Sequence, residues 1–346
     1  MPEMPPNEAK QIVFPAIRRA EWERTPVPAP GDLGPTQALV RAACTLVSAG
    51  TEIAIYSGAH IGYSIPGAQY PRLPFHPGYA FAGTVEAVGS AVTTLRPGDR
   101  VGGSLRHSDW SVVEVGRSSL FPLPEEVTFE QACLARLASI SMQGVRLAGV
   151  RLGEAVAVFG QGLIGQFARQ LAALDGAATT IGVDLIDSRL EVARTHGATH
   201  LVNPSRDEVA AAIGAATDGR GVDVAIEATG APTVINDALR AAALLGRVIL
   251  LGSPRGRVEI DPYSDIHRKG VSVIGSHAGT AAASANAYYR WTTAEHLRLA
   301  VEYMRQGRLR TDGLVTHRVP PDDALGVFDA LTERSQEYLG VIIQWR

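Results

Sequence analysis

Apolar and polar residues follow two different rhythms along the chain. Up to about residue 125, short apolar runs recur between proline and glycine residues, and such runs predict β-strands. The RPGD segment at 96–99 predicts a tight turn, because its proline presets φ and its glycine tolerates a positive φ. The first part of the chain is therefore predicted to be β-rich. Its strands are expected at 38–48, 83–89, 99–103, 110–115 and 120–123.

After residue 126, continuously apolar runs alternate with amphipathic stretches of helical length. Such strands, separated by helices, are typical of a parallel sheet that is covered on both faces. This region is therefore predicted to be a doubly wound α/β domain. Its strands are expected at 154–159, 179–184, 200–203, 222–228, 247–252 and 271–276. Its helices are expected at 129–149, 163–174, 188–196, 207–216 and 233–243.

The C-terminal part mixes both kinds of element. Leu297, Val301 and Met304 share one helix face, and Gly307 suits the end of that helix. We expect this tail to return to the first domain. Its other elements are predicted as strands at 314–319 and 340–345 and a helix from residue 323 with Asp322 as its N-cap.

Composition narrows the possible functions. The 346 residues are 46% apolar and 19% charged, which predicts a globular protein of about two domains. The net charge of −3 is close to zero, so it does not indicate binding to nucleic acid or to a membrane surface. Lys10 and Lys269 are the only lysines, and neither completes a GxxxxGK[ST] phosphate loop or the Tyr-x-x-x-Lys pair of short-chain reductases.

The cysteines and the apolar runs point to a reducing compartment. Cys44 and Cys133 are the only cysteines, so neither a disulfide framework nor a four-cysteine zinc lobe is expected. The N-terminal MPEMPPNEAK has no apolar segment like that of a signal peptide, and no run approaches the length of about 18 residues that a membrane span needs. A cytoplasmic protein is the resulting expectation.

The segment GQGLIG at 160–165 predicts a dinucleotide site, because it follows a predicted strand and opens a predicted helix. Gly160 permits the tight turn, Gly162 lets the backbone approach a pyrophosphate, and Gly165 lets the helix and strand pack closely. The free N–H groups of the helix start favour an anion.

Asp184, at the end of the next strand, predicts a preference for NAD. Its carboxylate is placed to accept hydrogen bonds from ribose hydroxyls and to repel a 2′-phosphate. Arg189 would then cover the adenosine or partly offset that preference. The structural alternative is that Asp184 caps the helix near Asp187 and Ser188.

The order of these segments resembles the medium-chain dehydrogenase/reductase superfamily, and its zinc-type alcohol and polyol dehydrogenases in particular. That resemblance implies an α/β protein with a GroES-like β-rich catalytic domain, 1–125 completed by 277–346. An inserted Rossmann domain at 126–276, a doubly wound parallel sheet, would bind NAD. The matching segments are 49–58, 74–92, 96–101, 160–165, 196–203, 221–230 and 247–254. Further cofactor contacts implied for this chain are Leu163, Ile164, Thr229, Leu251, Ser253 and Ser139.

The residues at the family's zinc positions differ from the family pattern. The resemblance places Ala49, Tyr79 and Ala135 where zinc-dependent members carry their catalytic ligands. Alanine does not coordinate zinc, and tyrosine is not among its usual ligands. We therefore predict that this chain holds no metal. The resemblance also places Thr51 at the family's proton-relay position, with Glu52 directly after it.

Without zinc, hydride transfer at a carbon–oxygen bond needs a proton donor or acceptor, or an oxyanion site. We predict Tyr79 in this role, with Thr51 and Glu52 as a relay, while the alternative is that Tyr79 only fills the space of the metal. His277 is predicted near the nicotinamide carboxamide and the substrate. Weaker candidates in loops that line the family's substrate cleft are Tyr56, His60, His76, His107, Asp109 and Trp110.

The leading hypothesis is a zinc-independent, NAD(H)-linked oxidoreductase acting on a secondary alcohol or ketone, such as a polyol, sugar or cyclitol. The first alternative is a reductase of an activated C=C bond that prefers NADPH. The second is an enzyme that retains NAD and uses transient oxidation for elimination or epimerisation. The third is a dinucleotide-binding sensor without catalysis. A homodimer or homotetramer is expected from the resemblance, with a small molecule as substrate.

Overall fold

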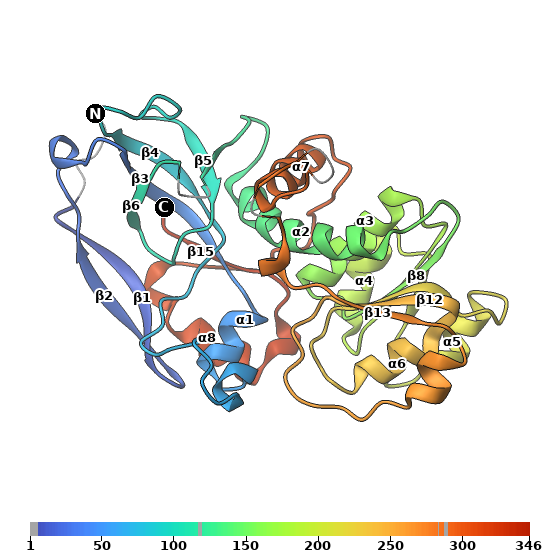
Figure 1. The fold of residues 1–346 in the computed structure, drawn as a ribbon. Coiled ribbons are helices and arrows are strands. Elements are labelled where there is room, and N and C mark those ends of the chain that lie inside the picture. Colours follow the sequence, from blue (N-terminus) through green and yellow to red (C-terminus); the bar gives the residue numbers. More distant parts are fainter. Residues whose placement is uncertain (1–5, 117–119, 283, 287–289) are drawn as a thin grey trace. The chain divides into compact units, whose positions relative to one another are not determined.

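The computed structural model describes residues 6–116, 120–282, 284–286 and 290–346 (Figure 1). It divides into two compact units, Met1–Arg136 with Val315–Arg346, and Leu137–Leu314. The functional domain limits expected at 125/126 and 276/277 stay a prediction. Within the described ranges, no helix is both long and apolar enough to cross a membrane.

The first unit is built on a seven-stranded sheet in the order β14-β15-β3-β4-β5-β7, with β6 also paired to β3. Only the β14–β15 pair is parallel. Because β15 pairs with β3, the C-terminal tail returns to the first sheet, as expected. The strands are β3 (Gln37–Val47), β4 (Phe81–Val88), β5 (Arg100–Gly103), β6 (Trp110–Glu114), β7 (Phe121–Pro122), β14 (His317–Val319) and β15 (Val341–Gln344).

Four elements of this unit differ from the prediction. The hairpin β1 (Glu8–Ala16) and β2 (Arg19–Pro26) and the short helix α1 (Thr51–Tyr56) were not expected. Helix α8 (Gly326–Glu333) begins later than predicted, so Asp322 as its N-cap is wrong. Asp322 lies instead in a 3-10 turn at Pro321–Asp323, where Pro321 at the first position presets the turn.

Aromatic rings join α1, α8 and the hairpin in the core of the first unit. The ring of Phe14 lies 4.8 Å from that of Phe328 and 5.1 Å from that of Tyr56, both edge to face. The hydroxyl of Tyr56 donates to Asp329 Oδ1 over 2.9 Å. Tyr56 is therefore part of the packing that holds α1 in place, which corrects its assignment to a cleft-lining loop.

The second unit contains a six-stranded parallel sheet in the order β10-β9-β8-β11-β12-β13. The predicted doubly wound parallel sheet is confirmed. The strands are β8 (Ala155–Phe159), β9 (Thr179–Val183), β10 (His200–Val202), β11 (Val222–Glu227), β12 (Ala242–Leu250) and β13 (Ser272–Gly275). The helices are α2 (Phe129–Ala148), which begins in the first unit, α3 (Leu163–Asp175), α4 (Asp187–Thr195), α5 (Val209–Ala215), α6 (Val234–Ala241) and α7 (Thr293–Arg305).

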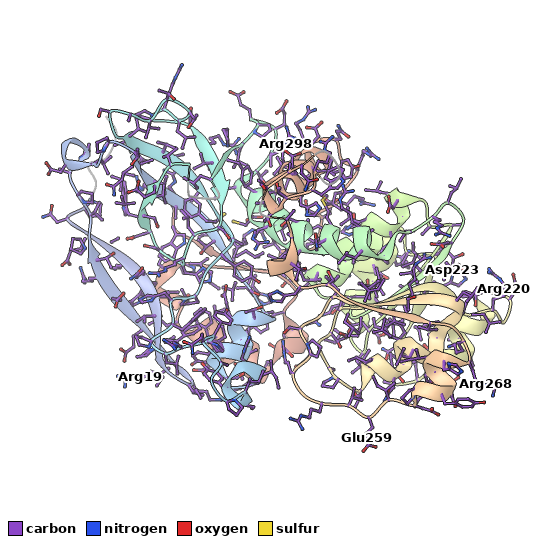
Figure 2. The ribbon with its side chains drawn as sticks, in the orientation of Figure 1. Arg19, Arg220, Asp223, Glu259, Arg268 and Arg298 are labelled. Atoms are coloured by element: carbon purple, nitrogen blue, oxygen red, sulfur yellow. The ribbon has the colours of Figure 1, made fainter. Side chains whose placement is uncertain are left out.

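The apolar strands explain this topology. All five residues of β8 are buried, as expected for a central strand with helices on both faces. The order of strands reverses between β8 and β11, and the carboxyl ends on either side of such a switch point form a crevice for ligands. Arg220, Arg268 and Glu259, labelled in Figure 2, point outward from this unit.

Candidate active site

The glycine loop has the backbone geometry that its sequence predicts. Gly160 directly follows β8 with φ of +88°, and a Cβ there would lie 2.7 Å from Thr229 Cγ2. A Cβ on Gly165 would lie 1.7 Å from the carbonyl oxygen of Gly160, so only glycine fits this first turn of α3. A Cβ on Gly162, by contrast, meets nothing within 4 Å. The loop is therefore closely packed at Gly160 and Gly165, whereas the space beside Gly162 is open.

The start of α3 is suited to an anion. Gly162 is the N-cap in an extended conformation, and no side chain of the described residues caps this end. The first N–H groups of a helix have no partner within the helix and carry partial positive charge. Leu163 and Ile164, both predicted cofactor contacts, form this first turn. The Ile164 carbonyl oxygen accepts a hydrogen bond from the Ser141 hydroxyl on α2 over 2.8 Å. Ser139, one helical half-turn earlier, is also buried.

Asp184 stands directly after β9 and is buried. Its Oδ2 accepts from Gln161 N over 2.6 Å and its Oδ1 from Ile186 N over 2.9 Å. The carboxylate therefore ties the glycine loop to the entrance of α4. Each oxygen retains lone-pair capacity for a ribose hydroxyl. Burial lowers the pKa of the neighbouring Arg189 guanidinium, and the charge of Asp184 opposes this effect.

The carboxyl ends of β11 and β12 complete this region. Glu227 is fully buried and accepts from Thr229 N over 2.6 Å and Gly230 N over 3.0 Å. Leu251 N donates to Glu227 O over 2.8 Å, and a Cβ on Gly230 would come within 2.5 Å of the Ser253 carbonyl oxygen. The predicted residues Thr229, Leu251 and Ser253 are thus brought together. The sequence analysis missed Glu227, although a carboxylate at the carboxyl end of a predicted parallel strand indicates a residue near the ligand crevice.

A second polar group lies in the first unit, where β3 leads into α1. The hydroxyl of Tyr79 donates to Ser48 Oγ over 2.5 Å, and Thr51 N donates to the same oxygen over 3.4 Å. Glu52 follows in the first turn of α1 and is buried. The structure therefore brings Tyr79 and Thr51 to the hydroxyl of Ser48, which the sequence analysis missed, and Glu52 follows Thr51 in the chain. The catalytic roles of Tyr79, Thr51 and Glu52 stay predictions.

The surroundings keep the Tyr79 hydroxyl protonated. Burial raises its pKa above 10.0, and the charge of Glu52 raises it further. Hydrogen bonds with Ser48 and Thr51 and the charge of Arg136 act in the opposite direction. The Arg136 guanidinium lies 5.5 Å from the centre of the Tyr79 ring, and its Nε donates to Ser104 Oγ over 3.4 Å.

The two histidines His107 and His277 have different surroundings. His107 is fully buried, not exposed in a cleft-lining loop, and both ring nitrogens contact side chains of the first unit. His277 belongs to the second unit and is exposed, and its Nδ1 accepts from Gly279 N over 3.1 Å. That bond caps the short turn Ala278–Thr280. The catalytic role of His277 stays a prediction.

The two cysteines contact each other. Cys44 Sγ and Cys133 Sγ are 3.7 Å apart, and both side chains are buried. Among residues 6–116, 120–282, 284–286 and 290–346, no group of three or more His, Cys, Asp or Glu side chains is placed to hold a metal ion.

The chain matches two family profiles. The alcohol dehydrogenase GroES-like domain matches residues 34–116, and the zinc-binding dehydrogenase profile matches residues 164–294. The chain therefore belongs to the medium-chain family of zinc-type alcohol and polyol dehydrogenases.

Individual relatives extend over most or all of the chain. An alcohol dehydrogenase of Cupriavidus necator is 28% identical over 383 aligned positions, which cover 97% of this chain and 98% of the relative. The D-guloside 3-dehydrogenase of Shigella flexneri is 31% identical over 75% of this chain and 76% of its own length. An alcohol dehydrogenase of Escherichia coli CFT073, solved with NADH, superimposes with a TM-score of 0.79 at 19% identity, covering 98% and 100% of the two chains.

Proposed function

We propose that the protein is a zinc-independent, NAD(H)-linked oxidoreductase that interconverts a secondary alcohol and its ketone. The observation that carries this proposal is the Tyr79 hydroxyl, hydrogen-bonded to Ser48 at the position where the family resemblance expects a metal-binding histidine. Tyr79 lies in the first unit, and the second unit carries the glycine loop that we propose binds the dinucleotide.

The donors present in the first unit do not fit a catalytic zinc. Zinc in proteins is bound by thiolate, imidazole and carboxylate groups in tetrahedral geometry. Ala49 and Ala135 offer only methyl groups at two of the family's ligand positions. The nearby imidazole of His107 has both nitrogens engaged, and the thiols of Cys44 and Cys133 face each other. The donor set therefore supports a mechanism without the metal.

The reaction is best derived in the direction of ketone reduction. The dinucleotide, when bound, supplies the hydride that adds to the carbonyl carbon. When a ketone is bound, the Tyr79 hydroxyl turns its one hydrogen from Ser48 Oγ to the carbonyl oxygen and transfers that proton as negative charge develops. The Ser48 hydroxyl then donates to the phenolate and relays to it a proton that is taken up from solution. The sum is the ketone, NADH and one proton giving the alcohol and NAD⁺.

The raised pKa of Tyr79 agrees with this role. A hydroxyl that stays protonated at neutral pH is a suitable donor, because the alkoxide that forms is far more basic than a phenolate. The same property makes Tyr79 a poor base in its resting state. We therefore propose that reduction is favoured at neutral pH and that alcohol oxidation is faster in alkaline solution.

Asp184 supports NAD over NADP as the cofactor. Its buried carboxylate lies at the tip of β9, where the ribose of a bound dinucleotide is recognised in this fold. A 2′-phosphate there would meet a negative charge. A polyhydroxylated substrate is proposed from the relatives, since one of them is a D-guloside dehydrogenase. A homodimer or homotetramer remains part of the proposal.

Replacing Tyr79 tests the proposal directly. Tyr79→Phe removes only the hydroxyl and is expected to lower the rate of ketone reduction by about 10²–10⁴ at saturating NADH, the range for a lost general acid. Tyr63→Phe is the matched control, because the hydroxyl of that tyrosine, in the same unit, donates to the backbone carbonyl of Ile55 over 3.4 Å. A loss below threefold in Tyr79→Phe would show that Tyr79 fills space and does not take part in the reaction.

A further inference from the structure

Glu227 is a buried carboxylate that takes no part in the proposed reaction. It is the last residue of β11, and its side chain is fully buried. A carboxylate that is removed from water requires hydrogen-bond donors from the protein, because an unpaired buried charge is strongly unfavourable. The groups that donate to Glu227 therefore indicate what this side chain does.

The donors of Glu227 come from a single turn of the chain, at residues 229–230. Its Oε1 accepts from Thr229 N over 2.6 Å and from Gly230 N over 3.0 Å, and the Thr229 hydroxyl donates to the same oxygen. Gly230 N also lies 3.3 Å from Oε2. An ionised carboxylate offers about four acceptor sites, which is enough for all three donors, whereas the single oxygen of a glutamine amide offers about two.

This turn packs directly against the glycine loop. In the parallel sheet Glu227 is paired with Phe159, the residue before Gly160, and Ala228 N donates to Phe159 O over 2.8 Å. Thr229 then lies against Gly160, where a Cβ would come within 2.7 Å of Thr229 Cγ2 and 3.2 Å of Thr229 N. The turn and the glycine loop are therefore in close contact.

The segment after β12 encloses the same turn from another side. Arg255 N donates to Gly230 O over 3.0 Å, and a Cβ on Gly230 would come within 2.5 Å of the Ser253 carbonyl oxygen. Gly252 N donates to the backbone carbonyl oxygen of Glu227 over 2.7 Å. Because protein interiors are closely packed, a turn between two such segments cannot shift without displacing one of them.

We propose that Glu227 is a positioning residue of the dinucleotide site, whose carboxylate holds the turn at 229–230 against Gly160. Glu227 does not touch the dinucleotide in this proposal and acts only through Thr229 and Gly230. The inference rests on the proposed function, because it takes the glycine loop as the place where the dinucleotide binds. It adds that the affinity of this loop depends on a carboxylate that is buried beside it.

The charges near Glu227 agree with this role. Burial raises the pKa of Glu227, whereas the hydrogen bonds from Thr229 and Gly230 and the charge of Arg255 lower it. Burial lowers the pKa of the Arg255 guanidinium, and the charge of Glu227 opposes this effect. The donors of the turn and the nearby cation thus both favour the carboxylate form, which accepts all three hydrogen bonds.

Two carboxylates of β11 allow a matched comparison. Asp223, labelled in Figure 2, lies near the amino end of the strand, and its Oδ2 accepts from Ala155 N over 2.8 Å. Glu227→Gln keeps the size of the side chain but leaves at least one donor of the turn without an acceptor, so the NADH dissociation constant should rise about tenfold or more. Asp223→Asn makes the same chemical change at the other end of the strand and should change that constant less than about twofold.

The readout is a fluorescence titration of the full chain with NADH, at a temperature at which circular dichroism shows each variant to be folded. Denaturant unfolding of each variant gives the accompanying change in stability. A role in packing alone predicts that Glu227→Gln is less stable but binds NADH with unchanged affinity once folded, and that result would overturn the proposal. Equal weakening of NADH binding in Asp223→Asn would also overturn it, because the effect would then belong to the whole sheet.

A second variant covers the case in which Glu227→Gln does not fold. Glu227→Asp keeps the charge and withdraws the carboxylate from the turn by one methylene group, so it too should weaken NADH binding about tenfold or more. Unchanged NADH affinity in Glu227→Asp would contradict the proposal. If NADH binding depends on Glu227 as expected but no ketone is reduced, that result counts against the proposed function alone.

Discussion

The cofactor region of the second unit and the polar group around Tyr79 in the first unit are built in different ways. The cofactor region consists of backbone geometry: three glycines, a helix start and the carboxyl ends of parallel strands. The group around Tyr79 consists of side chains that arrive from α1, β3, the segment before β4 and the β5–β6 loop. A site made by the backbone keeps its shape through local sequence, whereas a site made by distant side chains changes its chemistry with a few substitutions.

The largest effect is expected at Gly165. Gly165→Ala places a methyl group 1.7 Å from the Gly160 carbonyl, so the loop must move, and we expect a loss of about 3 kcal/mol or more in the free energy of unfolding. Denaturant titration measures this. Gly214→Ala in α5 is the control, because its new methyl group meets nothing within 4 Å. It should stabilise the helix by about 0.5–1 kcal/mol.

Gly162→Ala tests whether the same glycine loop binds the dinucleotide. Its methyl group meets no protein atom within 4 Å, so the variant should fold normally. It should still weaken NADH binding about tenfold or more, which corresponds to about 1.4 kcal/mol, because the methyl group occupies the open side of the loop. Unchanged NADH affinity in a fluorescence titration would contradict the placement of the dinucleotide at this loop.

The next effect concerns Asp184. Asp184→Asn removes the negative charge at the tip of β9, and the NADH dissociation constant should rise about 10–100-fold while discrimination against NADPH shrinks. Parallel titrations with NADH and NADPH measure both changes. Asp187→Asn is the control, since Asp187 is exposed and bonds Asn203 and Arg206. If Asp184→Asn preferred NADH over NADPH as strongly as the unmodified protein does, the Asp184 carboxylate would not be the cause of that preference.

The cofactor region was predictable because its residues are close in sequence and their spacing is typical of a dinucleotide-binding loop. Gly160, Gly162 and Gly165 lie within one turn between a strand and a helix, and Asp184 ends the next strand, so spacing alone was sufficient. The alternation of apolar strands and helices likewise predicted the sheet of the second unit. No such pattern marks β2, whose residues are mostly polar and half-exposed, and the hairpin was missed.

The polar group of the first unit was only partly predictable for the same reason. Tyr79, Thr51 and Glu52 were found because the family resemblance marks their positions. Ser48 has no such mark. The resemblance marks His107 only as a residue of a loop beside the substrate cleft, whereas His107 contacts Glu52 across 55 positions of sequence. A histidine in a loop between short strands looks solvent-exposed in the sequence. Only the folding of that loop onto β3 and α1 shows that it is buried.

A further difference between the two units lies in their buried histidines. His107 is paired with a carboxylate, whereas His296 on α7 accepts from the Arg146 guanidinium over 3.1 Å. Burial and then the charge of Arg146 lower the pKa of His296 to about 4, from 6.5. The unfolded chain therefore binds a proton that the folded protein does not bind, so stability falls as the pH drops from about 6.5 to 4.

This pH dependence should reach up to about 3 kcal/mol, because each tenfold change in proton affinity corresponds to about 1.36 kcal/mol. His296→Gln keeps an acceptor for Arg146 and cannot titrate, so it should flatten the pH dependence between 6.5 and 4. Thermal unfolding over this pH range measures the difference. An equally steep dependence in His296→Gln would show that other groups cause the acid sensitivity.

The central claim is that the polar residues of the first unit do their chemistry without zinc. Its most direct test is elemental analysis of the purified protein, combined with ketone reduction before and after exhaustive chelation. The account predicts zinc well below one atom per chain and a rate that chelation leaves unchanged. One zinc per chain, lost together with the activity on chelation and restored with it, would contradict the account.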